Sequence, residues 1–161
     1  MPGSGKSTVG VLLAKSLLKD FADTDLIIQK NRGTALCNIL QEKGVQGFIE
    51  LENEIISHCS FTNCVVATGG SAVYGKKAME NLRENSVIIY LSVPCDELEK
   101  RIHNIHTRGI AMESGTTIKE LFCQRKALYE TYADITVDCM GLTAEECVNL
   151  IVGKLKNHKS L

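Results

Sequence analysis

The first seven residues of the chain, Met-Pro-Gly-Ser-Gly-Lys-Ser, constrain its fold more than any other segment. Gly5, Lys6 and Ser7 end the phosphate-loop pattern Gly-x-x-x-x-Gly-Lys-Ser/Thr, whose first glycine would lie one position before this chain begins. In such a loop, Gly3 and Gly5 turn backbone N–H groups toward a phosphate, and the following helix points its positive end at the same place. The pattern therefore predicts a phosphate-binding loop rather than an ordinary glycine-rich turn.

The side chains of this loop suit the parts of a nucleoside triphosphate. Lys6 supplies a point charge for the β- and γ-phosphates, and the Ser7 hydroxyl can ligate Mg²⁺. We therefore expect ATP and Mg²⁺ to bind here. The candidate ATP-binding residues of this segment are Gly3, Ser4, Gly5, Lys6, Ser7 and Thr8.

A buried strand runs directly into this loop in phosphate-loop proteins, and no residues precede it here to form one. We expect a missing segment upstream of Met1. Without that central strand, two neighbouring strands would have unpaired edges, which is costly. A chain of this length is therefore expected to be fragile, or to borrow a strand from a partner.

Amphipathic helices alternate with short apolar strands along the rest of the chain. This alternation indicates a parallel sheet that is covered on both faces. The predicted fold class is α/β, a three-layer α/β/α phosphate-loop fold with a parallel sheet that lacks its first, central strand. We predict helices at residues 6–19, 34–42, 45–59, 76–83, 95–104, 117–132 and 143–156, strands at residues 20–22, 64–68, 87–93 and 135–137, and a flexible loop at residues 105–116.

Composition narrows the possible partners. The 161 residues suit one domain, 1–161, and 18 basic against 19 acidic residues leave a net charge of −1. That balance argues against a basic groove for nucleic acid, and no apolar run approaches the roughly 20 residues of a membrane helix. Seven cysteines without a Cys-x-x-Cys pair favour reduced thiols and a cytoplasmic location. No sequence feature points to a protein partner.

Two short motifs follow predicted strands and are candidates for ligand binding. Asp23 and Asp25 come after the strand at residues 20–22, and α/β sheets bind ligands at the carboxyl ends of their strands. These two carboxylates also suit the N-terminus of a helix. Gly69 and Gly70 end the strand at residues 64–68, where bare backbone can approach a ligand closely or simply turn into the next helix.

Further motifs occur in a fixed order along nearly the whole chain. They are the segment 3–10 (GSGKSTVG), the segment 21–25 (FADTD), the segment 44–48 (GVQGF) followed by Glu52, the segment 67–70 (ATGG), the segment 87–91 (VIIYL), Arg101 followed by Arg108, and the segment 125–129 (RKALY) leading to Ala133 and Asp134. In this order and spacing, residues 3 to about 152 resemble the shikimate kinases.

This resemblance implies an activity and a division of the chain. It implies a nucleoside-monophosphate-kinase-like P-loop kinase fold and ATP-dependent phosphorylation of the 3-hydroxyl of shikimate, a small hydroxy acid, in chorismate and aromatic amino acid biosynthesis. It also implies a substrate-binding region at about residues 25–60 and a mobile lid at about residues 104–117.

The resemblance also implies roles for residues on the nucleotide side. Asp23 organises the Mg²⁺ shell through water, beside Ser7. Lys6 and Arg108 are catalytic, and Arg108 closes with the lid over the phosphates and stabilises charge in the transition state. Arg101 stacks on adenine. From the residues alone, a solvated Arg108 and a surface ion pair of Arg101 are the alternatives.

On the acceptor side, the resemblance makes Asp25 the third catalytic residue. Asp25 accepts hydrogen bonds from the substrate hydroxyls and orients or deprotonates the nucleophile. Gly69 and Gly70 lie against the substrate, and Arg125 holds its carboxylate through the two-pronged guanidinium. A salt bridge on the surface of a helix is the alternative for Arg125.

The chain departs from the family pattern at three positions. Ile49 follows Phe48 where the family has an arginine that helps to hold the substrate carboxylate, and Ser71 replaces the third glycine of the Gly-Gly-Gly turn. Gly109 replaces the proline after the lid arginine and is expected to loosen the lid. The candidates to compensate for the missing arginine are Arg32, Lys76 and Lys77.

These departures leave three functions open. The first is a shikimate kinase that holds its substrate mainly through Arg125 and Asp25. The second is a related P-loop kinase that acts on another hydroxylated small metabolite, motivated by Ile49 and Ser71. The third is a nucleotide-binding fragment without turnover.

Overall fold

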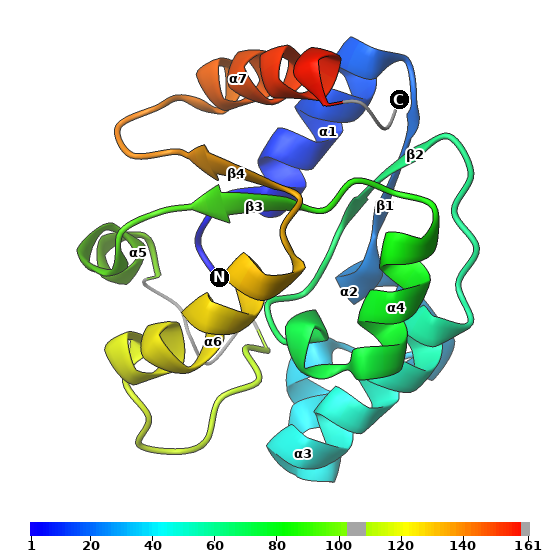
Figure 1. Cartoon of the computed structure of the whole chain (residues 1–161). Helices are drawn as coiled ribbons and strands as arrows, with labels where there is room; N and C mark the ends of the chain where they lie inside the picture. Colours follow the sequence, from blue (N-terminus) through cyan, green and yellow to red (C-terminus); the bar gives the residue numbers. More distant parts are fainter. Residues whose placement is uncertain (103–108, 159–161) are drawn as a thin grey trace.

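The structure is a computed structural model that describes residues 1–102 and 109–158. Helices and strands alternate along the chain (Figure 1). In chain order the elements are α1 (Lys6–Leu17), β1 (Asp20–Asp23), α2 (Thr24–Arg32), α3 (Leu36–Ser57), β2 (Cys64–Ala67), the 3₁₀ turn η1 (Ala72–Tyr74), α4 (Lys76–Glu84), β3 (Ile89–Ser92), α5 (Cys95–Arg101), α6 (Ile118–Tyr132), β4 (Ile135–Asp138) and α7 (Ala144–Asn157).

The strands form two separate parallel pairs within the described residues. β1 pairs with β2 from Asp20 opposite Cys64 onward, and β3 pairs with β4 from Ile89 opposite Ile135 onward. The predicted α/β class with parallel strands is confirmed, and the split into two pairs matches the expectation of a sheet without its central strand.

Helices pack against the strands on both sides. α1 and α7 contact each other and lie above the strands in the view of Figure 1, where α1 also contacts β1 and β2. α3, α4 and α6 lie below them, with α3 against α4 and α6 against η1. This placement puts the starts of α1, α2 and η1 near the carboxyl ends of β1 and β2.

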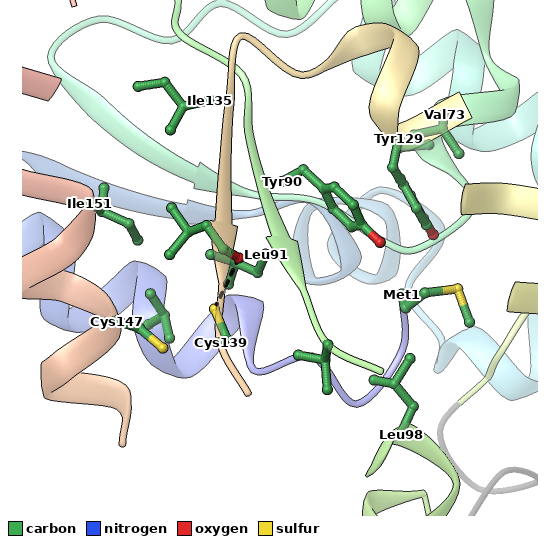
Figure 2. Close-up of a cluster of buried hydrophobic side chains, with 14 of the residues drawn as sticks. Met1, Val73, Tyr90, Leu91, Leu98, Tyr129, Ile135, Cys139, Cys147 and Ile151 are labelled. Carbon is green, nitrogen blue, oxygen red and sulfur yellow. Dashed lines mark hydrogen bonds between the residues drawn. The ribbon is translucent and has the colours of Figure 1, made fainter. Parts of the chain in front are cut away.

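Two apolar clusters hold these elements together. The larger one joins both strand pairs to α1, α6 and α7, and includes the fully buried Val137 and Ile151. Within it, the Tyr90 and Tyr129 rings stack with centroids 5.3 Å apart (Figure 2). The smaller cluster joins α2, α3 and the segment after residue 108, and its members are Ile28, Leu36, Ile39, Phe48 and Ala111.

Most predicted elements are confirmed, with two differences. The helix α2 was not predicted; it begins because the Asp23 carboxylate caps it by accepting from the Asp25 backbone N–H at 2.9 Å. The two helices predicted at residues 34–42 and 45–59 form one element, α3, with a kink at Gly44, whose φ of 68° and ψ of 178° are not helical. The predicted helix at 95–104 and loop at 105–116 lie partly outside the described residues.

The capping box at the start of α7 gives a stability prediction. The Thr143 hydroxyl accepts from the Glu146 N–H, and the Glu146 carboxylate accepts from the Thr143 N–H at 2.8 Å. We expect Thr143→Ala to lower the free energy of unfolding by about 1 kcal/mol, because an N–H at the helix end loses its partner. Urea unfolding would measure this, with Thr131→Ala on the exposed side of α6 as the control. Equal stability of both variants would contradict the assigned cap.

Candidate functional site

The phosphate loop has the left-handed backbone that its glycines allow. Gly3 has φ of 77° and Gly5 has φ of 87°, a region that residues with a Cβ rarely adopt. Gly5 immediately precedes α1, and its carbonyl accepts from the Val9 N–H at 2.9 Å. The loop therefore ends at a helix N-terminus, where free N–H groups and the helix dipole favour an anion.

This loop lines a cavity of about 410 Å³, the first cavity of the site. Residues from distant parts of the chain line it as well. Its walls combine a helix N-terminus, a carboxylate, a glycine turn and two arginines. The lining residues are Pro2, Gly3, Gly5, Lys6, Ser7, Thr8, Asp25, Phe48, Thr68, Gly69, Gly70, Ser71, Arg101, Gly109, Ile110, Ala111 and Arg125. Of the predicted site residues within the described chain, Ser4 and Asp23 are the two that do not line it.

Ser4 and Asp23 make local contacts instead. The Ser4 hydroxyl donates to the Met1 carbonyl at 2.8 Å, so this side chain faces its own loop. The Asp23 carboxylate accepts from the Ser7 hydroxyl at 2.7 Å and also caps α2. A hydroxyl beside a carboxylate is the oxygen donor set that Mg²⁺ prefers, and Mg²⁺ needs few protein ligands. Both earlier interpretations of Asp23, helix cap and metal-site residue, fit this geometry.

The Gly69–Gly70 turn is held by side chains from two helices. The Gly69 N–H donates to the hydroxyl of Thr24 at 3.0 Å, and Tyr129 donates its hydroxyl to the Gly70 carbonyl at 2.7 Å. Burial raises the pKa of Tyr129 to about 12, so this hydroxyl keeps its proton. A Cβ on Gly69 would lie 2.5 Å from an oxygen of Glu52 and 2.7 Å from an oxygen of Asp25. A side chain therefore cannot replace the glycine without moving a carboxylate.

Glu52 is a buried carboxyl behind this turn. Its side chain is 1% exposed, and neither oxygen has a hydrogen-bond partner of good geometry, although the Ser71 hydroxyl lies near enough to favour the charged form. Burial and the neighbouring Asp25 raise the pKa of Glu52 to about 7, against the attraction of Arg125 and Lys6. The carboxyl is thus partly protonated at neutral pH.

Lys6 and Asp25 both line the first cavity, and their charges interact. Burial lowers the pKa of Lys6, and the nearby Asp25 and Asp23 carboxylates act in the opposite direction. Burial also raises the pKa of Asp25, while Lys6 favours its charged form. The Lys6 ammonium donates to the Met1 carbonyl at 2.7 Å. The two opposite charges therefore lie in a region with little water, where charges interact strongly.

Arg125 is buried in the interior, with 1% of its surface exposed, so the alternative of a surface salt bridge is wrong. Its guanidinium donates to the Ala111 carbonyl and, at 3.4 Å, to the Tyr74 hydroxyl, and it lies 5.2 Å from the centroid of the Tyr74 ring. One nitrogen lies 3.1 Å from the point that a Cβ of Gly70 would occupy. These contacts fix the guanidinium at the wall of the first cavity.

The other basic candidates differ in whether they line the first cavity. Arg101 lines the first cavity and also pairs with Glu97 at 3.0 Å, so the ion pair is present and its stacking on adenine stays a prediction. Arg108 lies outside the described residues. The three residues suggested as compensating cations are exposed and do not line this cavity; they are Arg32, Lys76 and Lys77.

Two of the three departures from the family pattern contact the first cavity. Ser71 is buried in its wall, and Gly109 lines it with φ of 63°. A Cβ at Gly109 would lie 2.6 Å from the Leu36 Cβ, and proline cannot adopt this φ. Glycine at this position thus has a packing reason, and its predicted loosening of the lid stays a prediction. Ile49 lines a second, neighbouring cavity.

Three residues of the site stand within the sequence motifs but were given no role there. Thr24 is fully buried beneath the glycine turn, and it lies between the two aspartates that drew attention. Glu52 lies four residues after Phe48, and Tyr129 lies four residues after Arg125, so each shares a helix face with a residue of the cavity wall. That spacing is the signal that could have identified them.

Two features are absent from the described residues, 1–102 and 109–158. No helix there is long and apolar enough to cross a membrane. No group of three or more histidine, cysteine, aspartate or glutamate side chains there is arranged to hold a metal ion.

Comparison with known proteins gives one consistent result. The shikimate kinase family model matches residues 2–156. The chain is 36% identical over 155 residues to the shikimate kinase of Persephonella marina, covering 96% of this chain and 94% of that protein. It is 35% identical to the shikimate kinase of Nitrosomonas europaea, covering 97% of this chain and 75% of that protein.

Solved structures give the same result. A shikimate kinase from Acinetobacter baumannii in complex with shikimate superposes with a TM-score of 0.87 at 25% identity, covering 98% of this chain and 90% of that one. The shikimate kinase of Aquifex aeolicus superposes with a TM-score of 0.78 at 31% identity, covering 95% and 90% of the two chains.

The buried Glu52 predicts a pH-dependent stability. Its pKa rises from 4.5 to about 7 on folding, so the folded state binds the proton more tightly, and stability is lost as the pH rises from about 4.5 through about 7. Glu52→Gln removes this loss. We expect the variant to gain up to about 3 kcal/mol relative to the parent between pH 4.5 and pH 8.

Urea unfolding of both proteins at the two pH values measures this difference. Glu54→Gln, at an exposed position of the same helix, is the control and should leave the pH dependence unchanged. Parallel stability curves for Glu52→Gln and the parent would contradict the buried, proton-holding carboxyl.

Proposed function

The chain belongs to the shikimate kinase family and is an ATP-dependent kinase, and from that premise we propose that it transfers the γ-phosphoryl group of ATP to the 3-hydroxyl of shikimate. One observation supports this most directly: the phosphate loop, Asp25 and Arg125 line a single cavity. A phosphate-binding element, a carboxylate for a hydroxyl and a cation for a carboxylate are thus within reach of one small substrate. The reaction belongs to aromatic amino acid biosynthesis.

The nucleotide side of the proposal uses the start of α1. The N–H groups after Gly3 and Gly5 hold the phosphates, and Lys6 neutralises the charge that develops on the transferred group. Ser7 would hold Mg²⁺ directly and Asp23 through water, and the ion, when bound, would neutralise the phosphate oxygens. Thr8 and Ser4 complete the loop. Arg101 lines the same cavity, which supports a role in stacking on the adenine ring.

The acceptor side uses the glycine turn and two charged side chains. Asp25 accepts a hydrogen bond from the reacting hydroxyl and orients its lone pair toward the phosphorus. The Gly69 and Gly70 backbone lies against the substrate ring, and Arg125 binds the carboxylate. Because Ile49 carries no charge, Arg125 is the main cation for that carboxylate in this chain. Among the described residues, the arginines that line the first cavity are Arg125 and Arg101.

The reaction is an in-line displacement. The acceptor oxygen forms a bond to the γ-phosphorus as the bond between that phosphorus and the bridging β–γ oxygen breaks, and ADP leaves. The hydroxyl proton passes to Asp25 and from there to solvent. Lys6 stabilises the equatorial oxygens throughout. Arg108, which lies outside the described residues, is proposed to close over the same oxygens.

Two regional roles and a location belong to this proposal. Residues about 25–60 form the substrate-binding region and residues about 104–117 the lid of a single kinase domain. The tight contact of Gly109 with Leu36 supports a lid that closes onto α3. All seven cysteines lie in the described residues and are free thiols, which supports a reducing, cytoplasmic location.

Lys6→Met tests the nucleotide side. We expect shikimate-dependent ADP release to fall by about a hundredfold or more, because a preorganised charge on the phosphates is lost, while far-UV circular dichroism stays unchanged. Lys77→Met, at an exposed lysine outside the cavity, is the matched control. Substantial residual turnover in Lys6→Met would overturn the assigned phosphate site.

Arg125→Lys tests the acceptor side. A lysine keeps the charge but loses the two-pronged contact, so we expect the KM for shikimate to rise about tenfold or more, with the KM for ATP little changed. Arg83→Lys, on the partly exposed α4, serves as the control. Steady-state kinetics would decide, and an unchanged KM for shikimate would mean that the carboxylate binds elsewhere.

A further inference from the structure

A second cavity of about 380 Å³ adjoins the first and takes no part in the proposed reaction. It lies between α3, the segment before α6, and α6 itself. Its lining residues are Val45, Gln46, Ile49, Tyr74, Ala111, Met112, Glu113, Thr116, Leu121, Gln124 and Arg125. Ala111 and Arg125 line both cavities, so the two spaces meet at the buried guanidinium.

The contacts of Arg125 place it at the boundary between the two spaces. Its Nε donates to the hydroxyl of Tyr74, which lines only the second cavity. Another nitrogen, Nη1, faces Gly70, which lines only the first. A group held by Arg125 in the first cavity therefore lies at the entrance to the second.

The walls of the second cavity suit an uncharged group. Val45, Ile49, Met112 and Leu121 contribute apolar surface, and the amides of two glutamines, Gln46 and Gln124, add neutral hydrogen-bonding groups. Its charged side chains within the described residues are Glu113 and Arg125. Glu113 disfavours a second anion, and the guanidinium already donates to Ala111 and Tyr74.

We propose that the second cavity extends the acceptor site, and that this chain phosphorylates cyclic hydroxy acids whose carboxyl group carries a small uncharged extension, as in an amide. The amide carbonyl accepts from Arg125, and the substituent enters the space beside Ile49 and Gln46. The transfer itself is unchanged: the ring hydroxyl oxygen bonds to the γ-phosphorus, ADP leaves, and the hydroxyl proton goes to Asp25. This inference rests on the proposed function and concerns the acceptor that its site selects.

The test compares two acceptors, shikimate and its N-methylamide, by kcat/KM in a coupled ADP-release assay. For the parent chain we expect the amide to stay within about tenfold of shikimate, because its loss of charge is offset by the apolar contacts of the extension. Failure to phosphorylate the amide while shikimate turns over would overturn the extended site and leave the proposed function intact. Failure with both acceptors would overturn the proposed function, and the extension with it.

Two variants locate the extension. Gln46→Trp fills the cavity from an exposed position, and Ile49→Arg places a cation in it that favours a free carboxylate. Each should lower the amide-to-shikimate ratio of kcat/KM by about tenfold. Thr131→Trp, at an exposed position of α6 outside both cavities, should leave the ratio and the activity unchanged. If both cavity variants keep the parent ratio with a native circular dichroism spectrum, the amide binds elsewhere and the proposal is wrong.

Discussion

The close approach of side chains to the Gly69–Gly70 turn is the constraint on which the rest of the site depends. Thr24 and Tyr129 fix its backbone from α2 and α6, while the carboxyls of Asp25 and Glu52 lie where a Cβ would stand. The turn thus ties β2 to three helices that are distant in sequence. Gly69 leaves room for these two carboxyls, and Gly70 leaves room for Arg125 and Pro2.

Charge is concentrated behind and around this turn. Lys6, Asp25, Glu52 and Arg125 all influence one another, and burial opposes the charged form of each of the first three. Buried charges are tolerated when they are compensated, and in return they act strongly because little water screens them. Such a site suits a reaction in which negative charge moves from one oxygen to another. Glu52 is the exception, because its oxygens lack hydrogen-bond partners of good geometry. Its burial therefore lowers the stability of the folded protein.

Sequence patterns predicted the elements better than the contacts between them. The glycine-rich loop before the first helix, the parallel strands and the last helix follow from local rules of backbone and helix chemistry, and the structure confirms them. The helix α2 was missed because it has nine residues and follows a strand directly. The burial of Arg125 was left open, because a helix-surface arginine and a buried one have the same local sequence.

The contacts between residues that are far apart in the sequence could be identified only in the three-dimensional structure. Nothing local to Glu52 or Thr24 indicates that either lies beneath a glycine turn that follows another strand. The division of the acceptor side into two cavities also depends on how α3 and α6 pack around Arg125. By contrast, the departure at Ile49 was visible in the sequence, and the structure places it at the second cavity rather than the first.

The central claim is that the phosphate loop and the acceptor residues of the first cavity act on one substrate pair. Phosphorus NMR of the chain with ATP, Mg²⁺ and shikimate tests it most directly. The account predicts a new phosphomonoester resonance coupled to the proton at the ring 3-position, appearing in step with ADP. ADP accompanied only by inorganic phosphate, or bound ATP that never turns over with shikimate, would contradict it.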